Sequence, residues 1–466
     1  MNQERSIEKI NQIIKPNMLN VVFGLVSMAS FVAICIMESR KEYIGIAALP
    51  VFYMLALMLW SARKRFYGIG TLIIHCMYFL RYTIFPVCII SGEYFCDFSL
   101  REYVPYFNKA CVLMCVEVVA VYIVLLLTTK RQPRAQPIVK TCSKNSIWKK
   151  VICVVVAVLM IYNILLYIMY PSLLSAYWGI LFIRQTTAAT GGLLNDMGGV
   201  LYYPYKLSTE FLKIAIIALL ASYIMNKKNW SEIKKILVMC PVLLVALFLG
   251  SAEQINSLIL TVGVGYYMLT KSNRYTVHII VVAVITATIG AFLFFSKIAD
   301  VTDKKSLARI IDNYFCGPMN IAATIGMKDL VPLGGEGFFN DLLSSIPILQ
   351  KFATPSVNEM FNSIYSLQGA ILPLTGYGYL YFGSVFSFVP AVAVAVFVSL
   401  LDFYIDCTPD EFRMICFYIV IHFALGIGMY TVTIYYSLAV YELMIPAIII
   451  VFVKLANKQK RLKKEI

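Results

Sequence analysis

Apolar runs of about 20 residues recur along the whole sequence, and they limit what this chain can fold into more than any other feature. A bilayer core about 30 Å thick needs about 20 helical residues to cross it, and only a helix satisfies every backbone group within such a run. Charged residues make up only 14% of the 466 residues, whereas an average soluble domain has about a quarter. The sequence therefore predicts an all-α, polytopic transmembrane helical bundle in one integral membrane domain.

The hydropathy pattern predicts about twelve spans. The seventh and eighth are short and are joined by the segment GSAEQIN, which predicts a tilted or partly re-entrant hairpin. The first run follows a polar stretch and has no small-residue cleavage site after it, so we expect it to remain as an anchor. The predicted spans cover residues 18–37, 43–61, 67–90, 108–128, 151–170, 207–225, 236–250, 257–270, 276–295, 374–400, 412–431 and 433–453.

Lysine and arginine residues cluster in the loops on one side of these spans. The clusters lie at residues 63–65, 130–150 and 227–235 and in the C-terminal tail. Because cytoplasmic loops carry an excess of Lys and Arg, this side is predicted to be cytoplasmic, and so are both termini. The net charge of +15 is therefore attributed to membrane topology and to contact with anionic lipid headgroups, not to nucleic-acid binding.

Two long loops, residues 171–206 and 296–373, lie on the opposite, external side. Long loops are usually functional or disordered, and these two are too rich in aromatic and aliphatic residues for disorder. The second loop contains two helix-like stretches, at residues 306–326 and 338–352. We expect such helices to lie at the membrane interface with their apolar side toward the bilayer.

Basic residues in the two external loops indicate an anionic ligand. Arg184 lies in FIRQTTAATGG, and Arg309 lies in LARIIDNYFCGP near Lys305. External loops normally avoid positive charge, and the arginine guanidinium presents a planar fork of donors that suits phosphate oxygens. The alternative is that these long side chains extend to lipid headgroups.

Three acids on the same side are candidates for a general base: Glu253, Asp312 and Glu336. Each could take the proton of a sugar hydroxyl. Asp312 follows Arg309 closely enough that the two would share a helix face, so a local ion pair is the alternative interpretation for this acid.

The remaining candidate site residues are two tyrosines and Arg81. Tyr314 and Tyr377 are candidate sugar contacts, because aromatic rings stack on pyranose faces; an interfacial aromatic belt is the alternative for Tyr377. Arg81 lies inside the third span, where a charge is costly and is usually functional or paired within the bundle. The sequence does not identify its partner. No nucleotide-binding, metalloprotease or nucleophile-elbow motif is present, so an ATP-driven pump is not expected.

The segments YFCGPMNIAATIG and LTGYGYLYFGSVFSFV, with the span pattern and the two long loops, resemble the Wzy family of oligosaccharide repeat-unit polymerases of O-antigen and capsule. The resemblance implies a GT-C-like bundle in the bacterial plasma membrane. It implies a glycosyltransferase that joins undecaprenyl-pyrophosphate-linked repeat units on the outer face of that membrane. Membrane lipids and the chain-length regulator and flippase of the same pathway are the implied partners, and no metal or cofactor is implied.

On this resemblance, Arg184 and Arg309 would match the loop arginines that hold the pyrophosphate. The family's motif places a Gly eleven positions after each Arg, whereas this chain has Asn195 and Asn320 there, and many members have a basic residue where Glu253 stands. The competing class is a lipid-linked oligosaccharide flippase, which should have short external loops and two related halves. A non-catalytic assembly partner is a third possibility.

The predicted topology can be tested with single cysteines in an otherwise Cys-free chain. A cysteine at Thr187 or Ser306 should react with a membrane-impermeant thiol reagent in intact cells, because both external loops are predicted to face outward. A cysteine within residues 129–150 should react only after lysis. Labelling of the two loop cysteines only after lysis would contradict the orientation and remove the external site.

Overall fold

The computed structural model is helical throughout the part of the chain that it describes, and no strand occurs there. This confirms the all-α prediction. The described residues are 16–61, 68–93, 98–130, 147–171, 173, 187–227, 254–271, 303–328, 335–346, 352–365, 370–406 and 408–465, with residue 349 and short stretches between 229 and 242.

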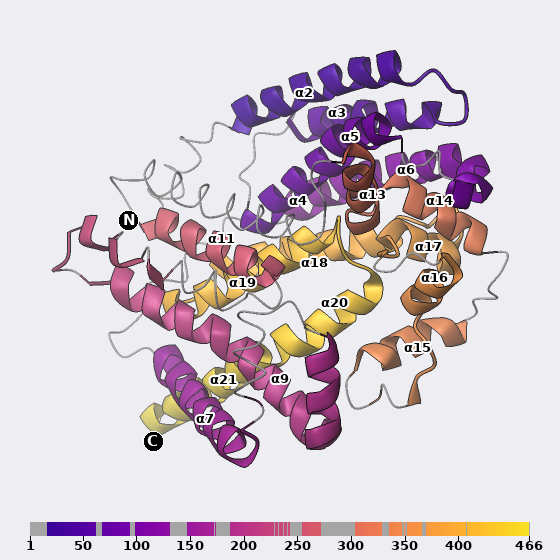
Figure 1. The fold of residues 1–466 in the computed structure, drawn as a ribbon. Helices are drawn as coiled ribbons and strands as arrows, with labels where there is room; N and C mark the ends of the chain where they lie inside the picture. Colours follow the sequence, from indigo (N-terminus) through magenta and orange to yellow (C-terminus); the bar gives the residue numbers. More distant parts are fainter. Residues whose placement is uncertain are drawn as a thin grey trace.

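The described elements are all helices (Figure 1). In chain order they are α2 (Pro16–Met37), η1 (Ile44–Ala47), α3 (Ala48–Ser61), α4 (Ile69–Phe79), η2 (Leu80–Ile84), α5 (Phe85–Gly92), η4 (Phe98–Tyr106), α6 (Phe107–Lys130), α7 (Ile147–Met169), α9 (Thr187–Met225), α11 (Gln254–Lys271), α13 (Lys304–Tyr314), α14 (Pro318–Met327), α15 (Gly335–Ser345), α16 (Val357–Tyr365), α17 (Leu374–Phe382), α18 (Val389–Asp406), α19 (Asp410–Gly426), α20 (Val432–Leu438), η6 (Ala439–Leu443) and α21 (Met444–Glu465).

Seven helical segments of the described chain are long and apolar enough to cross a membrane. They match the first six predicted spans and the last one. Two shorter apolar helices, Val389–Ile405 and Phe412–Gly426, occupy the tenth and eleventh predicted spans, and α11 covers the eighth. The predicted spans at 236–250 and 276–295 fall largely or wholly outside the described residues. The seven segments are Leu19–Met37, Ile44–Ser61, Ile69–Gly92, Arg101–Thr128, Ile147–Met169, Val200–Met225 and Val432–Asn457.

Helices α18 and α19 lie in the middle of the molecule, between the group α2–α6 and the group α7, α9 and α21 (Figure 1). Asp402 of α18 ties this centre to the first group. Its two carboxylate oxygens accept hydrogen bonds at 2.9 Å from the backbone N–H groups of Gly70 and Thr71, in the first turn of α4. These N–H groups have no partner within their own helix, so the carboxylate from α18 stabilises the start of α4.

The outer helices leave large apolar side chains uncovered. Leu25 and Ile36 of α2 and Ile161 and Ile168 of α7 are all more than half exposed. Such surfaces are costly in water and favourable against lipid tails, so they support the assignment of the chain as a membrane protein.

The predicted span at residues 374–400 is wrong as a single helix. The chain forms α17, reverses at Gly383, and then forms α18. Gly383 has φ of +74° and ψ of −176°, a combination that is essentially restricted to glycine. After the reversal Ser387 packs against Gly378, where an added Cβ would lie 2.1 Å from the Ser387 carbonyl oxygen. The Gly-rich segment is therefore a helical hairpin in which glycine permits close backbone contact.

The second long loop also differs from the prediction. Residues 306–326 form two helices instead of one, with a break at Cys316, whose φ is +54°. Nearly every residue of α14 is buried in the core, so this helix does not lie at an interface with only one side covered. In the first long loop, residues 187–206 belong to α9, which continues without interruption into the sixth predicted span.

Substitution of Gly378 by Ala tests the hairpin. The added methyl group would collide with the backbone of Ser387, so we expect the free energy of unfolding to fall by about 1–3 kcal/mol, as overpacking generally causes. The measurement is thermal unfolding of the purified protein in detergent. Gly24→Ala is the matched control, because no atom lies within 4 Å of the added group. Equal midpoints for both variants would contradict the close contact.

Candidate functional site

A buried ion pair lies between the third and fourth spans. Nη1 of Arg81 is 2.7 Å from Oε1 of Glu117, and the two side chains are 2% and 0% exposed. The Tyr78 hydroxyl donates to the same Oε1 at 2.8 Å, and the Thr375 hydroxyl donates to Oε2. The Arg81 Nε donates to the carbonyl oxygen of Cys316 at 3.1 Å. We call these five residues the ionic centre.

Four parts of the chain meet at the ionic centre. Arg81 lies on η2, a single π-helical turn between α4 and α5, and Glu117 lies within α6. The carbonyl of Cys316 comes from the break between α13 and α14, and Thr375 lies in the first turn of α17. The ionic centre therefore joins two spans to the second long loop. π-Helical turns of this kind occur frequently at functional sites.

The guanidinium of Arg81 has unused hydrogen-bonding capacity. Its Nη2 is buried and has no hydrogen-bond partner among the described residues. A buried donor left without a partner is unfavourable, and a charge at this depth is usually retained for function. The ionic centre thus presents a cationic donor that an anionic group could complete.

Helix α13 presents a cationic face next to α5. Ala308 and Ile311 are buried, and a Cβ added at Gly92 would lie 2.4 Å from that of Ala308, so the two helices pack very closely. Lys305 and Arg309 stay exposed, as does the neighbouring Lys304. The Asp303 carboxylate caps the helix by accepting from the backbone N–H groups of Lys305 and Ser306, each at 3.1 Å. The cationic face of α13 is thus held on a docked, capped helix.

Two lysines flank one tyrosine where α6 begins. Nζ of Lys109 donates to the Tyr379 hydroxyl at 3.0 Å and lies 4.8 Å from the centre of its ring. Nζ of Lys328 lies 4.8 Å from the same centre. Both lysines are exposed, and neither forms an ion pair with an acid in the described part of the chain. The ring favours each ammonium by a cation–π interaction, and the pair forms a second cationic group.

An aromatic cluster surrounds Asp341 of α15. The ring of Phe338 contacts those of Tyr377, Tyr381 and Tyr436, and the Tyr377 and Tyr381 centroids are 4.6 Å apart. The Asp341 carboxylate accepts from the Tyr381 hydroxyl at 3.0 Å and from a backbone N–H at 2.8 Å. Burial raises the pKa of Asp341, and these hydrogen bonds oppose that shift. Asp341 and Tyr377 are buried, and the rings of Phe338, Tyr381 and Tyr436 are half-buried.

Two sequence-predicted site residues lie outside the described residues: Arg184 and Glu253. Asp312 is fully buried, and its two oxygens accept from the backbone N–H groups of Met319 and Asn320, each at 3.1 Å. It therefore caps the start of α14, which the sequence interpretation did not anticipate.

The other predicted residues are spread over the second loop. Glu336 is exposed in the first turn of α15, and Tyr314 is half-buried at the end of α13. Tyr377 is only 1% exposed, and its ring lies 6.5 Å from that of Phe338, within the aromatic cluster. The structure thus places Lys305 and Arg309 on the same helix, both exposed, and places Tyr377 beside other rings. Glu336 is exposed, whereas the residues of the ionic centre are buried.

Sequence reasoning missed Glu117, Thr375 and a second buried pair, His422 and Glu442. A usable signal existed for both acids: Glu117 and Glu442 are single carboxyl groups inside the predicted spans 108–128 and 433–453. An acid inside a span is a candidate functional residue by default.

No protein-family model, curated protein or solved structure matches this chain. A function for it has to be argued from the chemistry of the site, because the fold alone does not specify one. The groups available for that argument are the ionic centre, the two cationic groups and the aromatic cluster.

Substitution of Glu117 by Gln tests the ionic centre. The change keeps the side-chain shape but leaves the Arg81 guanidinium without a counter-charge, so we expect the free energy of unfolding to fall by about 3–5 kcal/mol. Thermal unfolding in detergent measures the change. Glu210→Gln is the control, since its ion pair with Lys213 at 3.0 Å is about a fifth exposed on each side and should contribute at most about 1 kcal/mol. Equal losses in the two variants would contradict the role of the pair.

Proposed function

We propose that this chain is an oligosaccharide repeat-unit polymerase of the Wzy type. It would transfer a growing glycan from undecaprenyl pyrophosphate to the next lipid-linked repeat unit at the outer face of a bacterial plasma membrane. The bundle would be GT-C-like, with residues 171–206 and 296–373 facing outward. Membrane lipids surround it, and a flippase and a chain-length regulator are its expected partners.

The cationic face of α13 carries this proposal. Lys304, Lys305 and Arg309 are exposed on a helix that is docked against the end of the third span. The pyrophosphate of a membrane-anchored carrier lies at the level of the headgroups, close to the ends of the spans. A guanidinium there can hold phosphate oxygens through two parallel, charge-assisted hydrogen bonds.

A polymerase must hold two lipid-linked glycans at once, and the chain has two cationic groups. The first is the face of α13, and the second is the pair Lys109 and Lys328 around Tyr379. Helix α14 packs against α6, η4, α13 and α17, so it connects the elements that carry both groups. The half-buried rings of Phe338, Tyr381 and Tyr436 would offer a surface for the sugars.

The reaction itself needs no nucleotide. The acceptor hydroxyl oxygen forms a bond to the anomeric carbon of the donor, and the bond from that carbon to the pyrophosphate oxygen breaks. The electron pair leaves with the pyrophosphate, and the hydroxyl proton passes to a base. Orientation of the two substrates and stabilisation of the departing charge would supply most of the acceleration.

Deletion of the gene tests the proposal against the flippase alternative. A strain without the polymerase should accumulate lipid-linked single repeat units that are accessible on the outer face of the membrane, and it should lack long glycan. The position of the units is measured with an impermeant sugar-oxidising or lectin probe. Accumulation on the inner face would indicate a flippase, and an unchanged glycan profile would contradict both functions.

Substitution of Arg309 tests the pyrophosphate site. Arg309→Ala should lower the polymerisation rate about 100- to 1000-fold, the usual cost of removing a donor that stabilises the transition state. Arg309→Lys should retain partial activity with shorter chains, because it keeps the charge but loses the paired donors. Glycan length is measured on gels from the complemented deletion strain.

Lys454→Ala is the control for the loss of one positive charge. Lys454 is exposed on α21, near the C-terminus and far from Arg309 in the sequence. Protein levels in the membrane fraction should be equal for all three variants. Normal chain lengths with Arg309→Ala would make this arginine a headgroup contact and remove the proposed pyrophosphate site.

A further inference from the structure

A carboxylate, an imidazole and a phenol form a hydrogen-bonded row in the second half of the molecule. Nδ1 of His422 bonds to Oε1 of Glu442, and its Nε2 lies 2.8 Å from the hydroxyl oxygen of Tyr430. The three residues are only 3%, 7% and 8% exposed. Both nitrogens of the imidazole therefore have partners in a setting where electrostatic interactions are strong.

The direction of the hydrogen bonds follows when Glu442 is taken as an ionised carboxylate. A carboxylate at Glu442 can only accept, so Nδ1 of a neutral His422 carries the proton. Nε2 is then an acceptor, and the Tyr430 hydroxyl donates to it. The row is thus arranged to draw the phenolic proton toward the imidazole, and Glu442 stabilises the imidazolium that would form.

Separate elements build this row. His422 lies in the last turns of α19, Tyr430 lies in the connection that follows it, and Glu442 lies on η6. Like Arg81, Glu442 is thus a buried charged residue on a π-helical turn. In the described chain, the π turns are these two, and each carries a charge used at a buried site.

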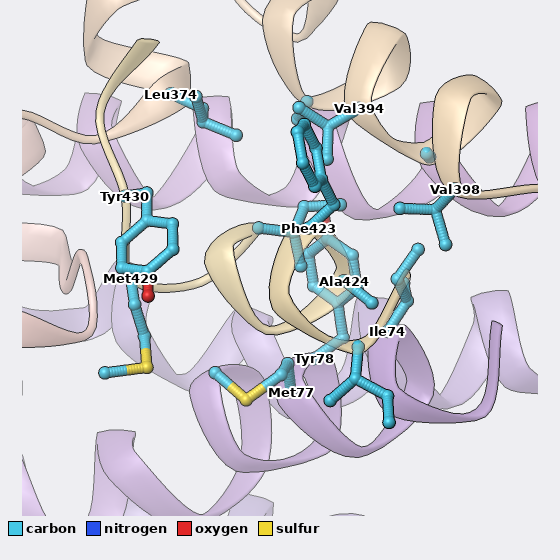
Figure 2. Packing of buried hydrophobic residues seen from close by; sticks show 14 of the residues in the cluster. Ile74, Met77, Tyr78, Leu374, Val394, Val398, Phe423, Ala424, Met429 and Tyr430 are labelled. Carbon is cyan, nitrogen blue, oxygen red and sulfur yellow. The ribbon is translucent and has the colours of Figure 1, made fainter. Parts of the chain in front are cut away.

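The connection that carries Tyr430 also touches the ionic centre. A Cβ added at Gly428 would lie 3.9 Å from Cδ of Arg81 and 3.1 Å from the terminal methyl of Met77. Figure 2 draws Met429 and Tyr430 of this connection in the same cluster of buried residues as Met77 and Tyr78 of α4 and Phe423 of α19. The same short segment therefore carries Tyr430 and contacts Arg81.

We propose that Tyr430, His422 and Glu442 form the proton-accepting relay of the glycosyl transfer. This inference rests on the proposed function. The acceptor hydroxyl gives its proton to the Tyr430 oxygen as the phenolic proton moves to Nε2 of His422. The hydroxyl oxygen forms the new bond to the anomeric carbon, and the pyrophosphate leaves with the electron pair. Tyr430 is the catalytic residue in this scheme, and Glu442 is a positioning residue that acts through His422.

The relay supplies a base that the predicted acids in the described part of the chain do not supply; Glu253 lies outside that part. Of the acids predicted from the sequence, Asp312 uses both oxygens to cap α14, and Glu336 stands exposed on α15. Tyr430 is instead joined through His422 to Glu442, so a proton taken from the substrate has a hydrogen-bonded path away from it.

Tyr430→Phe is the decisive variant, because it removes one oxygen atom and keeps the ring. Tyr435→Phe is its matched control: the Tyr435 hydroxyl donates to the carbonyl of Phe423 at 3.0 Å, and the two tyrosine rings contact each other at 6.0 Å. The purified variants are placed in nanodiscs with undecaprenyl-pyrophosphate-linked oligosaccharide, and kcat and KM are measured.

We expect Tyr430→Phe to lower kcat about 100-fold or more with little change in KM, which is the range for a lost general base. Glu442→Gln and His422→Gln should lower kcat in the same way, and Tyr435→Phe should stay within about twofold. Thermal unfolding should give equal midpoints for the two Tyr→Phe variants, which separates chemistry from folding.

Two outcomes would overturn the relay. If the wild type polymerises and Tyr430→Phe keeps the kcat of Tyr435→Phe, the relay is wrong while the proposed function stands. If the wild type makes no polymer from the lipid-linked substrate, the proposed function fails and the relay fails with it.

Discussion

A guanidinium and a carboxylate enclosed in an apolar bundle decide how the surrounding elements are arranged. Neither Arg81 nor Glu117 could stay charged at this depth alone, because an isolated ion in a medium of low dielectric constant is strongly destabilised. Each must meet the other, and further polar groups must stabilise both, although Nη2 of Arg81 keeps no partner among the described residues. This requirement brings the carbonyl of Cys316 and the hydroxyl of Thr375 into the bundle, and with them the ends of α13, α14 and α17.

Most of the helical framework could be predicted from the sequence, because hydropathy alone determines which segments enter a membrane. The break in the tenth predicted span could not be predicted from the sequence. The run from Leu374 to Leu400 is apolar throughout, and hydropathy does not register a reversal of direction. That reversal depends on the φ of Gly383 and on the fit of Gly378 against Ser387, which are properties of the folded backbone.

In the candidate site, too, some features could be predicted from the sequence and others could not. The exposure of Lys305 and Arg309 was predictable, since basic side chains on an amphipathic helix face away from its packed side. The partner of Arg81 was not predictable, because 36 residues separate it from Glu117 and only the packing of the spans brings them together. Asp312 had the spacing of an ion pair with Arg309, but the N–H groups at the start of α14 offered its oxygens two buried donors. Arg184 and Glu253 remain predictions.

The two π turns have a further consequence for the register of the chain. A π turn accommodates one more residue than an α turn, so it acts as a one-residue insertion in a span. Removal of one residue from Leu80–Ile84 or from Ala439–Leu443 would restore a regular helix, and the helical segments on both sides would keep their orientation because the wide turn had absorbed the extra residue. Only the side chains of the turn itself, Arg81 or Glu442 among them, would change their position. In an alignment with homologous chains that lack Arg81 or Glu442, we expect a single-residue gap at the corresponding turn. Such a gap would indicate a regular α-helix there, without the π turn and without the charged residue.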